Sequence, residues 1–314
     1  MATSKLRVFY GTSHPELGKQ IVKRLGLRPG KIRISRFACG EIYARILENI
    51  RGQDCVIIQT CNAKVNEDLM ELFMIIDALK RASAKTITVV IPHFGYARQD
   101  RKAASREPIS GRLIANLLET AGADRIVTMD LHSDQIQGFF NIPVDTLTAL
   151  PLFANYLKKK KLKDMVVVAP DTGRAKVAKK LADRIGARLA ILHKVRGEHN
   201  QSAVTHVVGY VKDKTVIITD DMIDTAGTIT NGVEALRKKG CKEDIYVVAT
   251  HGLFSGPAVE RMSKAGFREV VVTDTFPIPE EKQFKGLKVL SSAELLSEAV
   301  FRNYKNQSIS SLFD

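Results

Sequence analysis

The sequence predicts an α/β protein with two similar domains, each a mostly parallel sheet flanked by helices. Short apolar runs rich in Val and Ile recur along the chain, and such runs fit strands buried on both faces of a parallel sheet. Segments with apolar residues three and four positions apart, the period of an amphipathic helix, alternate with these runs. The stretches KTITVVIPHFGYARQDR and KDMVVVAPDTGRAKVAK also echo each other, because both combine a buried strand, a proline and a basic loop before a helix.

The first half alternates strands with helices. GTSHPEL turns the chain from its first strand into its first helix, with Pro15 in the first turn, where a missing N–H costs nothing. Strands are expected at Leu6–Tyr10, Lys31–Arg36, Ile42–Ile46, Asp54–Thr60, Lys85–Pro92 and Arg125–Met129. Helices are expected at His14–Leu25, Asn66–Ala82 and Ile109–Ala121. His93–Pro108 is polar, basic and irregular, and a loop at the carboxyl end of a strand is where function usually lies.

A second set of the same units begins near Leu147–Leu150. Its expected strands are Met165–Pro170, Arg188–Leu192, Val204–Val211, Thr215–Thr219, Ile245–Thr250, Glu269–Thr273 and Lys288–Leu290, with a polar loop over His193–Asn200. Its expected helices are Lys176–Ile185, Thr230–Lys239, Pro257–Ala265 and Ala293–Tyr304. We therefore predict an N-terminal domain over residues 1–147, a C-terminal domain over 148–290, and a last helix and tail over 291–314 that packs back on the N-terminal domain.

The composition is that of a soluble globular protein, since 45% of the 314 residues are hydrophobic and 26% are charged. No apolar run approaches the roughly 18 residues of a membrane helix, and MATSKLRVFYGTSHPEL lacks the apolar segment of a signal peptide. The four cysteines show neither metal-type spacing nor the density of a disulfide scaffold. We expect a cytoplasmic protein with no membrane partner.

The formal net charge of +14 is compatible with nucleic acid, an anionic membrane surface or phosphorylated small molecules as partners. The basic residues are scattered along expected helices except for Lys158–Lys161, and no basic run is interleaved with aromatic residues. Nucleic acid therefore stays a minor alternative and is not expected.

The stretch TVIITDDMIDTAGT, Thr215–Thr228, is the strongest chemical signal in the sequence. A buried strand stops at Asp220 and Asp221, a short turn follows, and a helical pattern begins. Backbone N–H groups of such a turn at a helix N-terminus bind an anion, and Gly227 lets the backbone approach it closely. The two acids can accept hydrogen bonds from sugar hydroxyls or hold hydrated Mg²⁺. The pattern predicts a ribose phosphate site; the alternative is an ordinary turn in which an acid caps the next helix.

The first half carries a second set of polar residues after its strands. His132 follows the strand Arg125–Met129, and an imidazole there can ligate a metal that bridges phosphates. A lone histidine is more often a satisfied structural residue, but Arg98 and Gln99 follow one neighbouring strand, and Phe37 and Glu41 follow another. An aromatic ring to stack on a purine, an acid for its amino group and an arginine for phosphate indicate a nucleotide site.

The motifs RFACGEI, GYARQDRKAASREPIS, MDLHSDQIQGFFNIPVD, APDTG, DDMIDTAGT and HGLFSGPA occur in this order, with an SISSLF tail. In this combination the whole chain resembles class I phosphoribosyl diphosphate synthetases, which are ribose-phosphate pyrophosphokinases. Type I phosphoribosyltransferases share only the block Asp220–Thr228. The resemblance implies two domains of the phosphoribosyltransferase type and a Mg²⁺-dependent transfer of the β,γ-diphosphate of ATP to the C1 hydroxyl of ribose 5-phosphate, giving AMP.

The resemblance also implies roles for individual residues. ATP would be bound by Phe37, Cys39, Gly40, Glu41, Arg98 and Gln99, and Mg²⁺ by His132 and Asp171. Ribose 5-phosphate would be bound by Arg196, Asp220, Asp221, Asp224, Thr225, Ala226, Gly227 and Thr228. Lys194 and Arg196 would be the catalytic cations of a flexible loop, for which the bland alternative is a solvated basic loop. These residue types suit the implied reaction, because such a transfer needs mainly positioning of the substrates and neutralisation of their charge.

The resemblance further implies a homo-oligomer, commonly a hexamer, that is inhibited by ADP and activated by phosphate. The residues in stretches similar to the regulatory site are Arg51, Arg81, Ser83, Arg101, Lys102, Ser105, Ser308 and Ser310. Two positions depart from the family pattern: Cys39 stands where Asp or Asn is usual, and PDTGR places Arg174 where Gly is usual and Val177 where Arg is usual. These departures keep open a non-catalytic regulatory subunit as one alternative, and a phosphoribosyltransferase is the other.

Overall fold

The structure is a computed structural model that describes residues 5–195 and 204–312. The chain divides into two compact units, which are considered separately. Unit 1 comprises Met1–Thr148, Thr275–Pro277 and Ser291–Asp314, and unit 2 comprises Ala149–Asp274 and Ile278–Leu290. Within the described ranges, no helix combines the length and the apolar character needed to cross a membrane.

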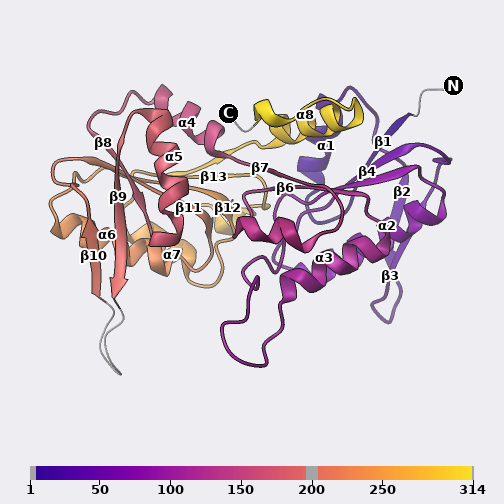
Figure 1. The fold of residues 1–314 in the computed structure, drawn as a ribbon, viewed down its shortest axis with the longest axis horizontal. Coiled ribbons are helices and arrows are strands. Elements are labelled where there is room, and N and C mark those ends of the chain that lie inside the picture. The colour runs from indigo at the N-terminus through magenta and orange to yellow at the C-terminus, as the bar shows by residue number, and fades with distance from the viewer. Residues whose placement is uncertain (1–4, 196–203, 313–314) are drawn as a thin grey trace. The chain divides into compact units, whose positions relative to one another are not determined.

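Unit 1 is built on a five-stranded sheet in the order β1-β4-β5-β6-β7, and all its neighbouring strands pair in parallel. Its strands are β1 (Leu6–Tyr10), β4 (Asp54–Ile58), β5 (Thr86–Val90), β6 (Arg125–Met129) and β7 (Val144–Leu147). Its helices are α1 (Pro15–Arg24), α2 (Val65–Arg81), α3 (Ser110–Ala121) and α8 (Ala293–Tyr304), with 3-10 turns η1 (Asp134–Phe139) and η4 (Ser310–Leu312). Helices α1 and α8 lie on one face of the sheet, and α2 and α3 lie on the other (Figure 1).

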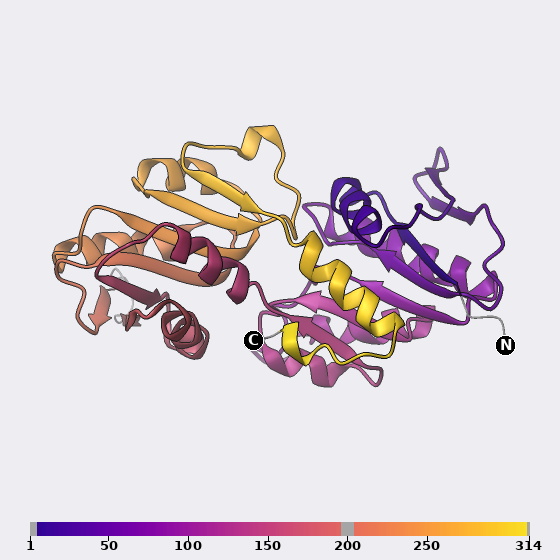
Figure 2. The same ribbon diagram turned by 90° about the horizontal axis from the view of Figure 1, so that it is seen from above.

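A two-stranded antiparallel hairpin, β2 (Ile32–Arg36) and β3 (Ile42–Ile46), stands outside this sheet, and β3 packs against α2. Strands β4 and β6 are buried from their second residue onward, because helices cover both faces of the sheet. Helix α8 returns from the end of the chain to lie beside α1, as Figure 2 shows. An ion pair from Arg24 to Glu294 (3.4 Å) and a hydrogen bond from the Ser291 hydroxyl to Gln20 (2.9 Å) join the two segments.

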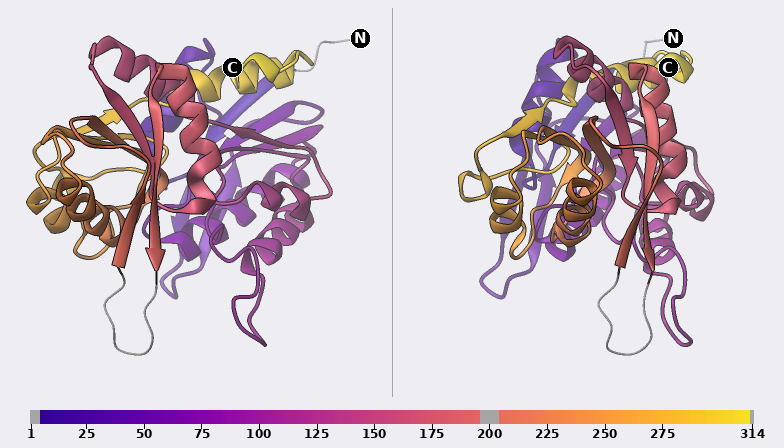
Figure 3. Two further views of the ribbon diagram at one scale, coloured as in Figure 1. Left: turned by 60° about the vertical axis from the view of Figure 1, so that its left-hand side comes forward. Right: turned by 90° about the vertical axis from the view of Figure 1, so that its left-hand side faces the viewer.

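Unit 2 contains a seven-stranded sheet in the order β10-β9-β8-β11-β12-β13-β14, in which only the β10–β9 pair is antiparallel. Its strands are β8 (Met165–Ala169), β9 (Arg188–Val195), β10 (Val204–Val208), β11 (Thr215–Ile223), β12 (Ile245–Gly252), β13 (Glu269–Thr273) and β14 (Leu287–Leu290). Its helices are α4 (Leu150–Lys159), α5 (Ala175–Ile185), α6 (Gly227–Lys238) and α7 (Ala258–Lys264), with 3-10 turns η2 (Thr172–Arg174) and η3 (Glu280–Lys282). Helices α4 and α5 cover one face, and α6 and α7 cover the other (Figure 3).

The predicted fold class, α/β with mostly parallel sheets, is confirmed, but two boundaries in unit 2 were wrong. Strand β9 continues to Val195, so His193–Val195 belong to a strand and not to the predicted loop, because β10 pairs with them; the rest of that loop, 196–200, lies outside the described residues. Strand β11 continues to Ile223 and includes both predicted loop acids, because Asp220 pairs with Ala249 and Met222 with His251 of β12. In both cases the neighbouring strand sets the length.

Candidate functional site

Several predicted site residues of both units follow the carboxyl ends of parallel strands. In unit 1, Arg98 and Gln99 follow β5, and His132 follows β6; in unit 2, Asp171 follows β8. The carboxyl edge of an open parallel sheet is where α/β proteins bind ligands, since loops from several strands meet there. The sequence therefore directs the polar residues of each unit to the edge where a site is expected.

The end of β11 leads into a turn with the backbone form of the predicted anion-binding turn. Ala226 has a left-handed backbone (φ 62°, ψ 0°), and α6 begins at the next residue, Gly227. A left-handed residue followed by helical ones turns successive N–H groups the same way, and the start of the 12-residue helix adds its dipole. Gly227 does not have the positive φ that would itself demand glycine, and a Cβ there would make only ordinary contacts with Thr225 and Arg261. A side chain at position 227 would therefore meet no steric conflict.

The two acids of β11 are unequally buried, with 17% of the Asp220 side chain and 4% of the Asp221 side chain exposed. Oδ1 of Asp220 accepts a hydrogen bond from the N–H of Asp221 at 2.8 Å. Burial, and then the neighbouring carboxyl of Asp221, raise the pKa of Asp220 well above its ordinary value, while Arg174 opposes the shift. Of the two acids, Asp220 is thus the one that the hydroxyls of a sugar can reach more easily.

Arg174 of η2 reaches both acids. Its Nη2 lies 2.5 Å from Oδ2 of Asp221, and its Nε lies 3.5 Å from Oδ1 of Asp220. The backbone N–H of Arg174 donates to Oδ1 of Asp171 at 3.0 Å, so that Asp171 caps the turn before α5. Asp171 is nevertheless exposed, and a carboxylate at a strand end can ligate a cation.

In unit 1 the turn of the β2–β3 hairpin holds the first group predicted to bind a nucleotide. The N–H of Phe37 donates to the carbonyl of Glu41 (2.9 Å), and Gly40 takes a positive φ of 96°. The ring of Phe37 is 56% exposed and rests edge-on against Tyr43, with the ring centres 5.8 Å apart. An aromatic face held out in this way is available for stacking on a base. Cys39 and Glu41 are exposed on the same turn.

The loop after β5 holds the second group. Arg98 and Gln99 are exposed, and Oε1 of Gln99 accepts a hydrogen bond from the hydroxyl of Ser110 at 2.6 Å. The hairpin and this loop both reach the first turn of α2. Arg36 pairs with Glu67 (2.5 Å), and the hydroxyl of Tyr96 donates to Oδ1 of Asn66 (2.5 Å).

His132 is half-buried and lies three residues after the end of β6. Between them, Asp130 has a φ of 37°. Among residues 5–195 and 204–312, no three His, Cys, Asp or Glu side chains are grouped as a metal site would need. In proteins Mg²⁺ is commonly held by one or two protein ligands together with a substrate's phosphates and water. An exposed carboxylate such as that of Asp171 and an imidazole such as that of His132 are compatible with that role.

The predicted catalytic cations are only partly covered by the structure. The backbone of Lys194 belongs to β9 and pairs with Thr205. Arg196 lies outside the described residues.

The predicted regulatory residues are not brought to one place within unit 1. Arg51 and Ser83 adjoin each other at the amino edge of the sheet, where the N–H of Gly52 donates to the Ser83 carbonyl at 2.8 Å. Arg81 ends α2 at the same edge. Arg101, Lys102 and Ser105 are exposed in the loop that follows the opposite, carboxyl end of β5. In the tail after α8, the hydroxyl of Ser308 donates to that of Ser310 at 3.1 Å.

Two groups of residues near these loops had not been predicted. Arg261 of α7 donates from Nη1 to the carbonyl of Thr225 at 3.0 Å, and so supports the anion-binding turn. In unit 1, Glu71 of α2 is 3% exposed and accepts from Thr12 and Gln59, next to the buried carboxyl of Asp68. No spacing signal could have identified Arg261, because it lies 36 positions from its partner. No separate sequence signal marked Glu71, because it lies among the apolar residues of a helical pattern.

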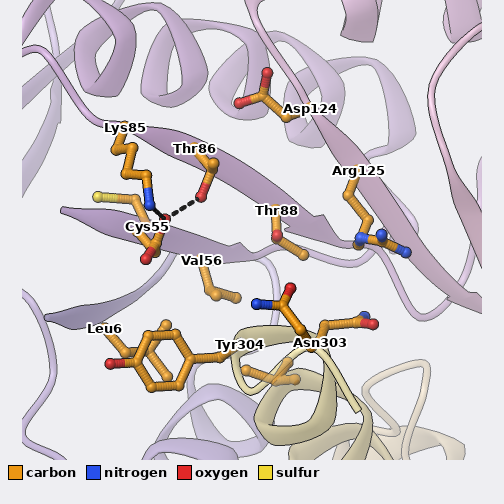
Figure 4. A pocket seen from close by; sticks show the side chains of 13 residues that line it. Leu6, Cys55, Val56, Lys85, Thr86, Thr88, Asp124, Arg125, Asn303 and Tyr304 are labelled. Atoms are coloured by element: carbon orange, nitrogen blue, oxygen red, sulfur yellow. Dashed lines mark hydrogen bonds and ion pairs between the residues drawn. The ribbon is translucent and has the colours of Figure 1, made fainter. Parts of the chain in front are cut away.

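A cavity of about 300 Å³ in unit 1 lies away from these loops, at the amino ends of β1, β4, β5 and β6 and beside the end of α8 (Figure 4). Its charged side chains already have partners. Lys85 and Thr86 both face Asp54, at 3.9 and 2.8 Å, and Arg125 pairs with Asp145 at 2.8 Å. The cavity is thus at the opposite edge of the sheet from the predicted nucleotide loops.

Comparisons with known proteins show which family the chain is similar to. Residues 6–122 match the model of the N-terminal domain of ribose phosphate pyrophosphokinase, and residues 200–314 match that of the phosphoribosyl synthetase-associated domain. A ribose-phosphate pyrophosphokinase of Fusobacterium nucleatum is 50% identical over 313 residues, 99% of both chains, and one of Bacillus subtilis is 51% identical over 98% of this chain and 97% of that one. The crystal structure of a phosphoribosylpyrophosphate synthetase from Mycobacterium smegmatis, 49% identical, superposes with a TM-score of 0.92 over 96% of this chain and 100% of that one.

Proposed function

The chain belongs to the family of ribose-phosphate pyrophosphokinases, and we propose that it transfers the β,γ-diphosphate of ATP to the C1 hydroxyl of ribose 5-phosphate, giving phosphoribosyl diphosphate and AMP. One observation of the fold supports this most directly. The acids Asp220 and Asp221 lie in the last four residues of β11, which is followed by the left-handed Ala226 and the start of α6, and this arrangement suits a sugar bearing a phosphate.

In the proposed complex, the 5-phosphate lies over the turn Asp224–Thr228, where N–H groups and the hydroxyls of Thr225 and Thr228 donate to it. Asp220 accepts hydrogen bonds from the ring hydroxyls. Both ends of the sugar are then fixed, and the C1 hydroxyl has one orientation. Fixing the nucleophile in this way supplies much of the rate acceleration that a transfer without a covalent intermediate needs.

The nucleotide is assigned to the loops of unit 1. The exposed ring of Phe37 stacks on the purine, and Arg98 and Gln99 contact the nucleotide from the loop after β5. The oxygen of the C1 hydroxyl attacks the β-phosphorus, the bond between that phosphorus and the α–β bridging oxygen breaks, AMP leaves with that oxygen, and the hydroxyl proton passes to solvent. Mg²⁺ neutralises phosphate charge when bound, and His132 and Asp171 would hold it. Lys194 and Arg196 are proposed to stabilise the transferring diphosphate.

Regulation and assembly extend the proposal. We assign ADP and phosphate as regulators and a homo-oligomer, a hexamer by family resemblance, as the assembled form. Arg51 and Ser83 at one edge of unit 1, and Arg101 and Ser105 beyond the other, support an effector site completed by a second copy, because one copy does not gather these residues.

The decisive experiment mixes the purified protein with ATP, Mg²⁺ and ribose 5-phosphate and follows AMP and phosphoribosyl diphosphate by phosphorus NMR, beside a Lys194→Ala variant. Both products should appear together with the wild type and collapse in the variant. The contact of Arg174 with Asp221 favours a second candidate, a binding subunit whose sugar site is blocked by its own guanidinium. Wild-type protein that forms no AMP would support that candidate and refute the synthetase.

A further inference from the structure

Arg174 makes a two-pronged contact with the acidic pair of β11. Its Nη2 lies 2.5 Å from Oδ2 of Asp221, and its Nε lies 3.5 Å from Oδ1 of Asp220. Only 14% of its side chain is exposed, so water screens the contacts poorly. A planar guanidinium suits two neighbouring carboxylates better than an ammonium does, because its donors point in fixed directions.

The fold fixes both the backbone and the side chain of Arg174. Strands β8 and β11 are parallel neighbours, with Val168 opposite Ile218, so the turn η2 after β8 lies beside the acids of β11. The carboxylate of Asp171 fixes the backbone of Arg174 through the 3.0 Å bond to its N–H. The side chain then spans from one strand end to the next, and its position is set before any ligand arrives.

The charges at this strand end favour a cation beside the acids. Asp220, Asp221 and Asp224 lie within five positions, yet the proposed ligand carries a phosphate dianion. A carboxylate that is 4% exposed, such as that of Asp221, is strongly destabilised without a partner. Arg174 cancels that charge and leaves Asp220 the more exposed of the two.

We propose that Arg174 is a positioning residue of the sugar phosphate site: it neutralises Asp221 and orients the carboxylate of Asp220 for the ring hydroxyls of ribose 5-phosphate. This inference rests on the proposed function and deepens it. Arg174 sets the affinity for the sugar phosphate through Asp221, and touches neither the nucleotide nor the transferred group.

The test measures binding of ribose 5-phosphate by calorimetry to the full chain, with Mg²⁺ and an ATP analogue whose α–β bridge is a methylene group and so cannot transfer. The variants are Arg174→Met, Arg174→Lys, Asp221→Asn and the double variant Arg174→Met/Asp221→Asn. Lys180→Met is the matched control, because it removes one cation from an exposed position of α5, the helix that follows Arg174. Circular dichroism and Tm report folding.

Arg174→Met should weaken ribose 5-phosphate binding by at least about tenfold, which is about 1.4 kcal/mol, and Arg174→Lys should lie between it and the wild type. Affinity for the analogue should stay within about twofold, and Lys180→Met should match the wild type. In the Asp221→Asn background the same Arg174→Met change should cost less than about threefold, because interacting residues are not additive. If Arg174→Met does not fold, Arg174→Lys carries the same comparison in both backgrounds.

Wild-type affinity in Arg174→Met would overturn the inference, and so would an undiminished loss in the Asp221→Asn background, which indicates direct contact with the ligand. The outcome is separable from the proposed function. Arg174-dependent binding with no AMP from the wild type would refute the synthetase and leave the inference standing. AMP formation with Arg174-independent binding would refute the inference alone.

Discussion

The carboxylate of Glu71 holds Thr12 at two points, accepting its N–H at 2.7 Å and its hydroxyl at 2.6 Å. It also accepts from Nε2 of Gln59 at 2.9 Å, so a single buried acid of α2 fixes the turn after β1 to the end of β4. This contact spans 59 positions of sequence and ties the first loop of unit 1 to its sheet.

Glu71→Gln should therefore lower the free energy of unfolding by about 2–4 kcal/mol, because an amide nitrogen would face buried donors. Urea unfolding measures the loss. Glu67→Gln is the control on the same helix: its ion pair with Arg36 is about half exposed and should be worth less than about 1 kcal/mol. Equal losses in the two variants would contradict the role given to Glu71.

Asp68 should make the stability of unit 1 depend on pH. Burial raises the pKa of its carboxyl from 3.8 to about 6, against the N–H of Asn62, which lowers it. The folded form thus favours the protonated acid, and the stability it contributes below pH 4 is lost as pH rises through about 6. Relative to Asp68→Asn, the wild type should lose at most about 3 kcal/mol between pH 4 and pH 7.

The measurement is the difference in unfolding free energy between the two proteins across that pH range. Asp77→Asn serves as control, because the Asp77 side chain, on the same helix, is 44% exposed. A difference that does not change with pH would show that Asp68 keeps an ordinary pKa.

Phe37→Ala should raise the KM for ATP by about tenfold, since stacking on a base is worth about 1–3 kcal/mol. The KM for ribose 5-phosphate should be unaffected, and so should Tm, because 56% of the ring is exposed. Phe37→Tyr should retain the affinity. Leu113→Ala removes an equally exposed apolar side chain from α3 and controls for surface effects. Equal changes in the two KM values would argue against a purine at Phe37.

Arg261→Met should raise the KM for ribose 5-phosphate by about two- to tenfold, the worth of one hydrogen bond of about 0.5–1.5 kcal/mol. The reason is that the turn loses the bond to the Thr225 carbonyl that holds its shape. Arg268→Met is the control, because Arg268 is an exposed arginine of the same unit that lies 3.9 Å from Asp244. If both variants behave alike, the effect is one of net charge.

Local patterns were sufficient to predict most of the fold. The runs that became β4, β5, β8 and β12 are mostly apolar, and the stripe Leu69, Leu72, Ile76 and Leu79 places α2 to within a residue or two. The block Asp220–Thr228 was recognisable because its acids, hydroxyls and glycine lie close together in the sequence. Each of these signals needs only a few consecutive residues.

The sequence by itself determined the α/β class, the order of strands and helices and the edge at which polar loops gather, because periodicity and turn chemistry act over short distances. Only the tertiary structure decided that β11 runs on through Asp220 and Asp221, since that depends on pairing with β12. It also decided that Ala226, and not Gly227, takes the left-handed turn, and that Arg174 faces both acids. These contacts join residues tens of positions apart, and their strength comes from burial, which no local pattern contains.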